Sequence, residues 1–217
     1  MSVTILLADD HPIVRQGLRH LLEASPDLKV VGEADNGLQA VQLAEKFKPN
    51  VLVVDMMMPE LNGLEVLKQV KERSPATCCI VLSMQSADVY VAEALRAGAL
   101  GYVLKETGPS ELVNAVHLVI GGQQYLSPRI SERLDELQID KAEEMISDPY
   151  QTLTNREREV LQMAAEGKTA ADIAKILSIS PRTAELHRGR MMSKLGLHNR
   201  ADLVRYAVKR GILPLES

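Results

Sequence analysis

Residues 51–67 read VLVVDMMMPELNGLEVL, a continuous apolar run that ends in an acidic residue and leads into a helical pattern. Such a run is typical of a strand that is buried on both faces, as in the interior of a parallel sheet. Leu64, Leu67 and Val70 then recur at helical spacing. The stretch therefore predicts a buried strand that ends at Asp55, followed by a loop and an amphipathic helix.

The same alternation extends in both directions from this stretch. Further short runs rich in Val, Ile and Leu are expected to be strands, and apolar residues at helical spacing lie between them. The expected strands are VTILLA (residues 3–8), Val30–Val31, CCIVLS (residues 78–83) and GYVLK (residues 101–105). This repeated alternation predicts an α/β domain with a doubly wound, five-stranded parallel sheet.

The pattern changes after residue 153, where no strand signal remains. Thr154 and Glu157 form a capping box, and Thr169 is suited to cap a second helix. A third helix is expected from Pro181 to Leu195, and a fourth begins after Asn199. We expect an all-α domain of four helices in which residues 169–195 form a helix-turn-helix.

The segment between these regions is more polar. Ser127 and Pro128 are suited to begin a helix, and the following KAEEMISDPYQ is typical of a tether. We therefore predict an α/β domain at residues 1–122, a linker helix and tether at residues 123–149, and a helical domain at residues 150–217.

Charge differs between the two predicted domains although the net charge of the chain is −4. Residues 150–217 carry 12 Lys and Arg against 7 Asp and Glu, whereas the preceding residues carry 13 against 22. This imbalance favours nucleic acid as a partner of the basic part. The apolar runs are too short to cross a membrane, and the two adjacent cysteines suit a reduced, cytoplasmic setting.

Chemically useful side chains gather at the expected ends of the strands. They are Asp9, Asp10, Asp55, Ser83 and Lys105. In a doubly wound sheet these strand ends face one crevice. Clustered carboxylates favour a hard divalent cation such as Mg²⁺ (or Mn²⁺), and a lysine and a hydroxyl can stabilise a phosphoryl group in transfer. A carboxylate beside the metal is then a workable nucleophile towards phosphorus.

Four motifs carry a resemblance to response regulators of the NarL/FixJ type. They are LADDHPIVRQGL (residues 7–18), VVDMMMPELNGLEVL (residues 53–67), VLSMQSADVYVAEALRAGALGYVLKE (residues 81–106) and LTNREREVL (residues 153–161). The resemblance implies a receiver domain with a flavodoxin-like fold, joined to a LuxR-type helix-turn-helix that binds double-stranded DNA. It also implies that a sensor histidine kinase phosphorylates Asp55, and that the chain is not an enzyme with a separate substrate.

The resemblance assigns further residues by position. Asp9, Asp10 and Asp55 would hold Mg²⁺ together with the backbone carbonyl of Met57. Ser83 would be the switch hydroxyl, Tyr102 the switch aromatic and Lys105 the phosphate-contacting lysine, while Pro59 and Gly63 would shape the loop after Asp55. Met57 and Gln85 occupy the positions that tune the lifetime of the phosphate. Because Met57 cannot orient an attacking water, we predict slow self-dephosphorylation.

The third helix of the basic domain is the expected reading helix. By the resemblance, Glu185, Leu186 and Gly189 lie nearest to base edges. Residues that contact or face the DNA backbone are Thr183, His187, Arg188, Arg190 and Lys194, and Arg182 adds to the same basic surface. An acidic residue such as Glu185 can accept a hydrogen bond from cytosine N4. The fourth helix matches the family's dimerisation element, so a homodimer is expected when the protein is active.

Two outputs of phosphorylation remain open at this point. It could release the reading helix from the receiver, or it could build a receiver dimer. Two other classes of protein are disfavoured by the sequence. A phosphate-independent scaffold would have no need of the intact set of Asp9, Asp10, Asp55, Ser83 and Lys105. A phosphatase would need a general acid or base where Met56 and Met57 stand.

Overall fold

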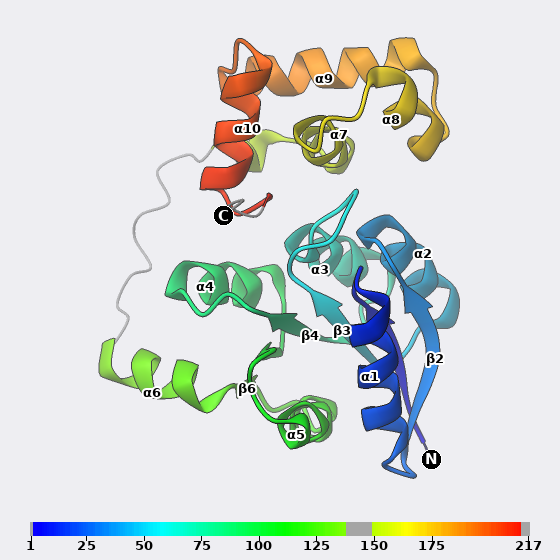
Figure 1. Cartoon of the computed structure of the whole chain (residues 1–217), viewed down its shortest axis with the longest axis vertical. Coiled ribbons are helices and arrows are strands. Elements are labelled where there is room, and N and C mark those ends of the chain that lie inside the picture. Colours follow the sequence, from blue (N-terminus) through cyan, green and yellow to red (C-terminus); the bar gives the residue numbers. More distant parts are fainter. Residues whose placement is uncertain (1, 138–148, 214–217) are drawn as a thin grey trace. The chain divides into compact units, whose positions relative to one another are not determined.

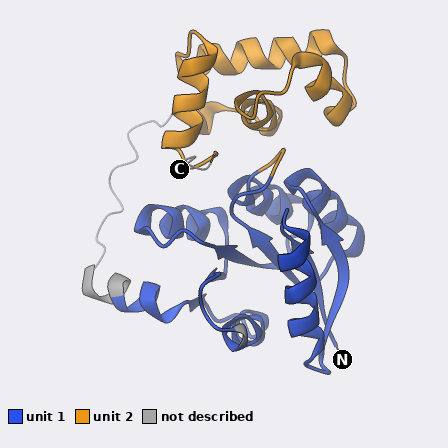
Figure 2. Cartoon of the chain, viewed as in Figure 1, with its two compact units in different colours: residues 1–58, 62–139 blue, residues 59–61, 140–217 orange. Residues whose placement is uncertain are grey.

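The computed structural model describes residues 2–137 and 149–213, which fold into two compact units. The first unit consists mainly of residues 1–139 and the second mainly of residues 140–217, coloured blue and orange in Figure 2. Most of the predicted tether falls on residues 138–148, which lie outside the described residues.

The first unit is built on a parallel sheet (Figure 1). Its strands are β1 (Val3–Ala8), β2 (Leu28–Ala34), β3 (Val51–Asp55), β4 (Cys78–Ser83), β5 (Gly101–Leu104) and β6 (Tyr125–Leu126). They lie in the order β2-β1-β3-β4-β5-β6. The direction of winding reverses between β1 and β3, and a crevice is expected at the carboxyl ends of the strands at such a point. The predicted doubly wound α/β class is confirmed.

The sheet has one strand more than the five that were predicted. Tyr125 and Leu126 pair in parallel with Gly101 and Tyr102 of β5, so the sheet continues past residue 122. A strand of two residues is too short to show an alternation of polar and apolar positions, which explains why the pattern did not reveal it. The predicted helix after it is present as α6 (Pro128–Leu137).

Helices cover both faces of this sheet. They are α1 (Pro12–Glu23), α2 (Gly37–Phe47), α3 (Gly63–Arg73), α4 (Asp88–Ala97) and α5 (Pro109–Ile120). Helices α1 and α5 pack on one face, where Leu22 and Val116 join a core that includes Ile5 and Val53. Helices α2, α3 and α4 form a layer on the other face (Figure 1). Burial on both faces explains the continuous apolar sequences of the central strands.

The second unit contains a short 3₁₀ helix, η1 (Pro149–Thr152), followed by α7 (Asn155–Ala165), α8 (Ala170–Leu177), α9 (Pro181–Leu195) and α10 (Arg200–Lys209). The capping boxes at Thr154 and Thr169 are both formed, and Ser180 and Asn199 cap the next two helices. Helix α9 ends where Gly196 adopts a left-handed conformation with φ of 64°. The structure therefore confirms the four predicted helices. They could be predicted because the signals that mark their ends are local in sequence.

A small apolar core holds these four helices together. Val160, Ile173, Met191 and Leu203, one from each helix, are buried. Met191, the member of this set from α9, is fully buried. Across residues 2–137 and 149–213, none of the helices combines the length and the apolar character needed to cross a membrane.

Candidate functional sites

Three of the predicted side chains meet at the carboxyl edge of the sheet. Lys105 Nζ donates hydrogen bonds to Asp55 Oδ2 at 2.7 Å and to Asp9 Oδ2 at 2.8 Å. Asp9 follows β1, Asp55 ends β3 and Lys105 follows β5, so strand pairing brings together residues that lie up to 96 positions apart. The lysine bridges the two buried carboxylates and offsets their mutual repulsion.

Burial and neighbouring charges have opposite effects on the pKa values of Asp55 and Lys105. Burial raises the pKa of Asp55, and the nearby Lys105 ammonium counteracts this effect only in part. Burial alone would lower the pKa of Lys105, but Asp55 and Asp9 outweigh it and hold that pKa above its ordinary value. The lysine is therefore charged at neutral pH, which is the state that can stabilise a phosphoryl group.

The same edge carries a cluster of possible metal ligands. One donor atom from each of Asp9, Asp10, His11 and Asp55 lies within 4.8 Å of the others. Asp10 Oδ1 is buried and accepts no hydrogen bond from the described part of the chain, although His11 Nδ1 lies 2.7 Å from it. Carboxylate oxygens in this arrangement fit a hard divalent cation. His11 was not predicted as a member of the cluster, although it directly follows the acidic pair.

Ser83 and Tyr102 are linked through Gln85. Ser83 is buried, and its Oγ accepts a hydrogen bond of 3.0 Å from the Gln85 backbone N–H. The fully buried Tyr102 donates from its hydroxyl to the Gln85 backbone oxygen at 2.7 Å. Burial raises the pKa of Tyr102 to about 12, so the hydroxyl remains a donor. Ser83, at the end of β4, and Tyr102, on β5, are thus both hydrogen-bonded to the Gln85 backbone in the loop between β4 and α4.

The loop after Asp55 is held close to the end of β3. Gly63 N–H donates to the Met56 oxygen at 2.9 Å, and a Cβ placed on Gly63 would lie 2.5 Å from the Asp55 backbone oxygen. Only glycine allows this approach without movement of the backbone. Met57 N–H reaches Asp55 Oδ1 at 3.4 Å, while the expected role of the Met57 carbonyl as a metal ligand stays a prediction.

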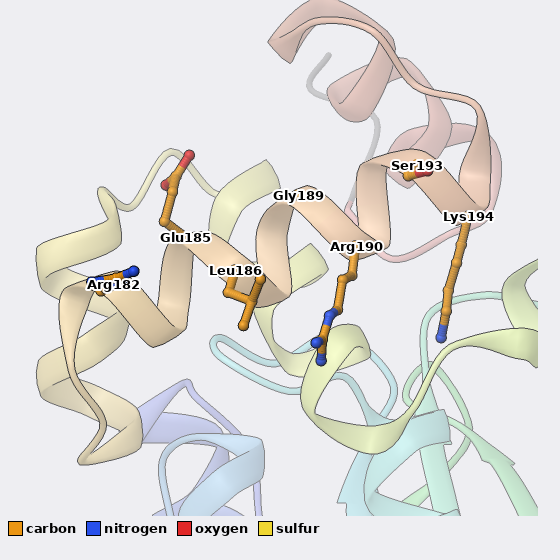
Figure 3. Close-up of a pocket in the computed structure, with 7 residues that line it drawn as sticks. All are labelled: Arg182, Glu185, Leu186, Gly189, Arg190, Ser193 and Lys194. Carbon is orange, nitrogen blue, oxygen red and sulfur yellow. The ribbon is translucent and has the colours of Figure 1, made fainter.

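Helix α9 presents a continuous face to solvent. An open pocket along it is lined by Arg182, Glu185, Leu186, Gly189, Arg190, Ser193 and Lys194 (Figure 3). Residues three and four positions apart lie on one side of a helix, so these lining residues form a stripe along α9. Leu186 is 51% exposed, a high fraction for a leucine. The stripe contains all three residues that were expected nearest to base edges.

Other residues predicted on α9 lie outside this stripe. Thr183 Oγ1 lies 2.8 Å from Ser180 Oγ at the start of the helix. Arg188 lies 3.9 Å from Glu185, and His187 is half-buried. The contact of these residues with a DNA backbone stays a prediction.

Lys194 is held by its own unit. Its Nζ donates to Glu157 Oε2 at 2.6 Å and to the Thr152 backbone oxygen at 2.9 Å. Burial alone would raise the pKa of Glu157, but hydrogen bonds from Lys194 and from the Thr154 backbone hold that pKa below its ordinary value. Lys194 therefore joins the end of α9 to the start of α7 in addition to its predicted role at the DNA backbone.

Comparisons with known proteins support both units. The model of the response regulator receiver domain matches residues 5–117, and that of the bacterial regulatory proteins of the luxR family matches residues 151–207. The chain is 35% identical over 213 residues to the transcriptional regulatory protein YdfI of Bacillus subtilis, covering 98% of this chain and 99% of that protein. It is 37% identical over 200 residues to the nitrate/nitrite response regulator protein NarL of Escherichia coli, covering 92% of each.

A solved structure also resembles most of the chain. The complex of the two-component response regulator RcsB with DNA has a TM-score of 0.60 and 31% sequence identity, covering 95% of this chain and 98% of that chain. Another structure of RcsB contains two dimers bound to two parallel DNAs.

Proposed function

Because this chain belongs to the response regulators of the NarL/FixJ type and is a DNA-binding transcriptional regulator, we propose that a sensor histidine kinase switches it by phosphorylating Asp55. The proposal depends above all on one observation, the bridge that Lys105 makes between Asp55 and Asp9. This bridge joins Asp55, the proposed acceptor, to Asp9 through Lys105, whose ammonium would contact the phosphoryl group.

The proposed reaction is a phosphoryl transfer from a phosphohistidine of the kinase. A carboxylate oxygen of Asp55 attacks phosphorus, the new P–O bond forms as the P–N bond breaks, and the released imidazole takes up a proton. Lys105 is positioned to contact the phosphoryl oxygens, because its ammonium already lies 2.7 Å from Asp55 Oδ2. No residue of the chain has to act as a general acid or base, and catalysis of a separate substrate is not part of the proposal.

Asp9, Asp10 and Asp55, with the backbone carbonyl of Met57, are the proposed ligands of Mg²⁺ (or Mn²⁺). When bound, this cation would neutralise charge on the phosphoryl oxygens. The clustering of the carboxylates within 4.8 Å of one another supports this assignment.

Phosphorylation adds roughly 1.5–2 negative charges and three acceptor oxygens at Asp55. In the proposed switch, Ser83 donates its hydroxyl hydrogen to the phosphoryl group, while Tyr102 is already buried with its hydroxyl on the Gln85 backbone oxygen, so no inward rotation of its ring is needed. Release of α9 and formation of a receiver dimer remain two possible outputs. A homodimer in the active state is supported by the RcsB dimers on DNA, and the resemblance assigns α10 to the dimerisation element.

The second unit is proposed to lay α9 in the major groove of double-stranded DNA. Glu185, Leu186 and Gly189 would lie nearest to the base edges, since all three line the exposed stripe of the helix. Leu186 offers an apolar contact for a thymine methyl group. The backbone contacts are proposed for Arg182, Thr183, His187, Arg188, Arg190 and Lys194.

We assign the receiver to residues 1–122, to which β6 adds Tyr125–Leu126, and the DNA-binding domain to residues 150–217. The intervening residues 123–149 are proposed to act as a linker helix and tether. A DNA target and a kinase partner both favour the cytoplasm as the site of action.

Intact mass spectrometry tests the phosphoacceptor. The wild-type chain and Asp55→Asn are incubated with acetyl phosphate and Mg²⁺, and only the wild type should gain the mass of one phosphoryl group. Asp88→Asn is a matched control, because Asp88 begins α4 outside the acidic cluster, and it should be phosphorylated normally. Equal labelling of wild type and Asp55→Asn would refute Asp55 as the acceptor. Turnover of p-nitrophenyl phosphate would instead favour a phosphatase.

The DNA assignment is tested with duplexes selected from a random-sequence pool by the phosphorylated chain. Arg190→Ala should weaken binding to selected and unselected duplexes alike, since a phosphate contact carries no sequence information. Leu186→Ala should mainly reduce the preference for selected duplexes. Unchanged binding in both variants would refute the assignment of α9 as the reading helix.

A further inference from the structure

Arg15 contacts the segment that carries the acidic pair. The residue lies on α1, and its Nη1 donates to the Asp9 backbone oxygen at 2.6 Å. Its Nε also donates to Glu33 Oε2 at 3.1 Å, and the side chain is only 16% exposed. A single guanidinium therefore connects the peptide after β1 with β2.

The oxygen that Arg15 binds belongs to the peptide that joins Asp9 to Asp10. The N–H of Asp9 is bound separately, to the Ala34 backbone oxygen at 3.2 Å. The two side chains on either side of this peptide are both members of the acidic cluster. The orientation of the peptide therefore decides whether the two carboxylates point towards Asp55.

A second interaction keeps Arg15 in place. Glu33 accepts from Arg15 through Oε2 and from Arg19 Nη1 through Oε1 at 2.6 Å. The carboxylate of Glu33 balances the charge of Arg15, so the guanidinium does not present an unpaired positive charge beside a cation site. Arg19 shares Glu33 with Arg15 but directs its Nε to Glu23, at the end of α1, rather than to the Asp9 oxygen.

We propose that Arg15 is a positioning residue for the divalent-cation site, and that it acts by orienting the peptide between Asp9 and Asp10. The inference rests on the proposed function, since it assigns a role in that same site. Residues that orient metal ligands typically contribute a factor of about 10–100 to metal affinity. Arg15 also lies outside the set of side chains that would touch the phosphoryl group.

The test measures Mg²⁺ binding by isothermal titration calorimetry on the full, unphosphorylated chain, with Mn²⁺ titrations followed by electron paramagnetic resonance as a second readout. Arg15→Met should raise the dissociation constant for Mg²⁺ by about tenfold. Arg19→Met is the matched control, because it removes the other arginine on Glu33, and its dissociation constant should stay within about twofold of wild type. Arg15→Lys should recover part of the affinity, since one donor can still reach the Asp9 oxygen.

A second measurement separates positioning from general stability. The rate of phosphorylation by acetyl phosphate is followed as Mg²⁺ is varied, and Arg15→Met should need more Mg²⁺ for half of the maximal rate while approaching the wild-type rate at saturation. If Arg15→Met does not fold by circular dichroism, Arg15→Lys alone must still show a shifted Mg²⁺ requirement. Unchanged Mg²⁺ binding in the folded Arg15 variants would overturn the inference while leaving the proposed function intact. A wild-type chain that neither binds Mg²⁺ nor accepts phosphate would refute both.

Discussion

Gly189→Ala should stabilise the second unit and weaken DNA binding at the same time. Gly189 lies in the middle of α9, is exposed, and a Cβ placed on it meets no heavy atom within 4 Å. The substitution therefore adds no clash within the chain, and it removes the cost of glycine in a helix interior, about 1 kcal/mol relative to alanine. For a domain of this size, 1 kcal/mol corresponds to a rise in melting temperature of roughly 4–8 °C.

The effect on DNA binding has the opposite sign. Gly189 lines the stripe that is proposed to face the bases, so a methyl group there occupies space that the helix backbone needs for a close approach. We expect the dissociation constant for a selected duplex to rise by about tenfold, which is ~1.4 kcal/mol. Differential scanning calorimetry and fluorescence anisotropy on the full chain measure the two effects.

Gly17→Ala is the matched control for this experiment. Gly17 also lies at an exposed position in the middle of a helix, α1, and a Cβ placed on it likewise meets no heavy atom within 4 Å. The substitution should stabilise the first unit by a similar amount without altering DNA affinity. If Gly189→Ala raised the melting temperature and bound DNA as tightly as the wild type, the close approach of α9 through Gly189 would be refuted.

The other predictions concern the receiver loop and the base of α9. Gly63→Ala should destabilise the first unit by about 3 kcal/mol in urea unfolding, because its methyl would lie 2.5 Å from the Asp55 backbone oxygen; a loss no larger than that of an ordinary surface substitution would contradict this. Because the folded-state pKa of Glu157 lies below its ordinary 4.5, its stabilising effect is complete above pH 4.5 and is lost as the pH falls through the folded-state value. Glu157→Gln should therefore lose stability at neutral pH through its weaker contact with Lys194, and show a flatter acid dependence than wild type in urea titrations from pH 3 to 7. The phosphorylated chain should lose its phosphate slowly, since Met57 cannot orient water, and a lifetime of seconds in purified protein with Mg²⁺ would disprove this.

Much of the fold and of the site could be predicted because its signals are local. The strand that ends at Asp55 is marked by a continuous apolar run, and the helices that begin after Thr154 and Thr169 are marked by capping boxes. In a parallel sheet all strand ends meet at one edge, so residues such as Asp9 could be placed in one crevice before the distances were known.

The tertiary structure decided those features that depend on contacts between distant segments. Tyr125–Leu126 forms a sixth strand because it pairs with β5 at the edge of the sheet. Lys194, which the resemblance predicts to face DNA, also binds Glu157. Arg15 lies within the first motif, but its contact with the Asp9 carbonyl cannot be read from that motif. The hydrophobic period and the helix caps depend on residues that are close in sequence, so they can be predicted from it. The partner of a long, charged side chain depends instead on which groups folding brings within about 3 Å of its end.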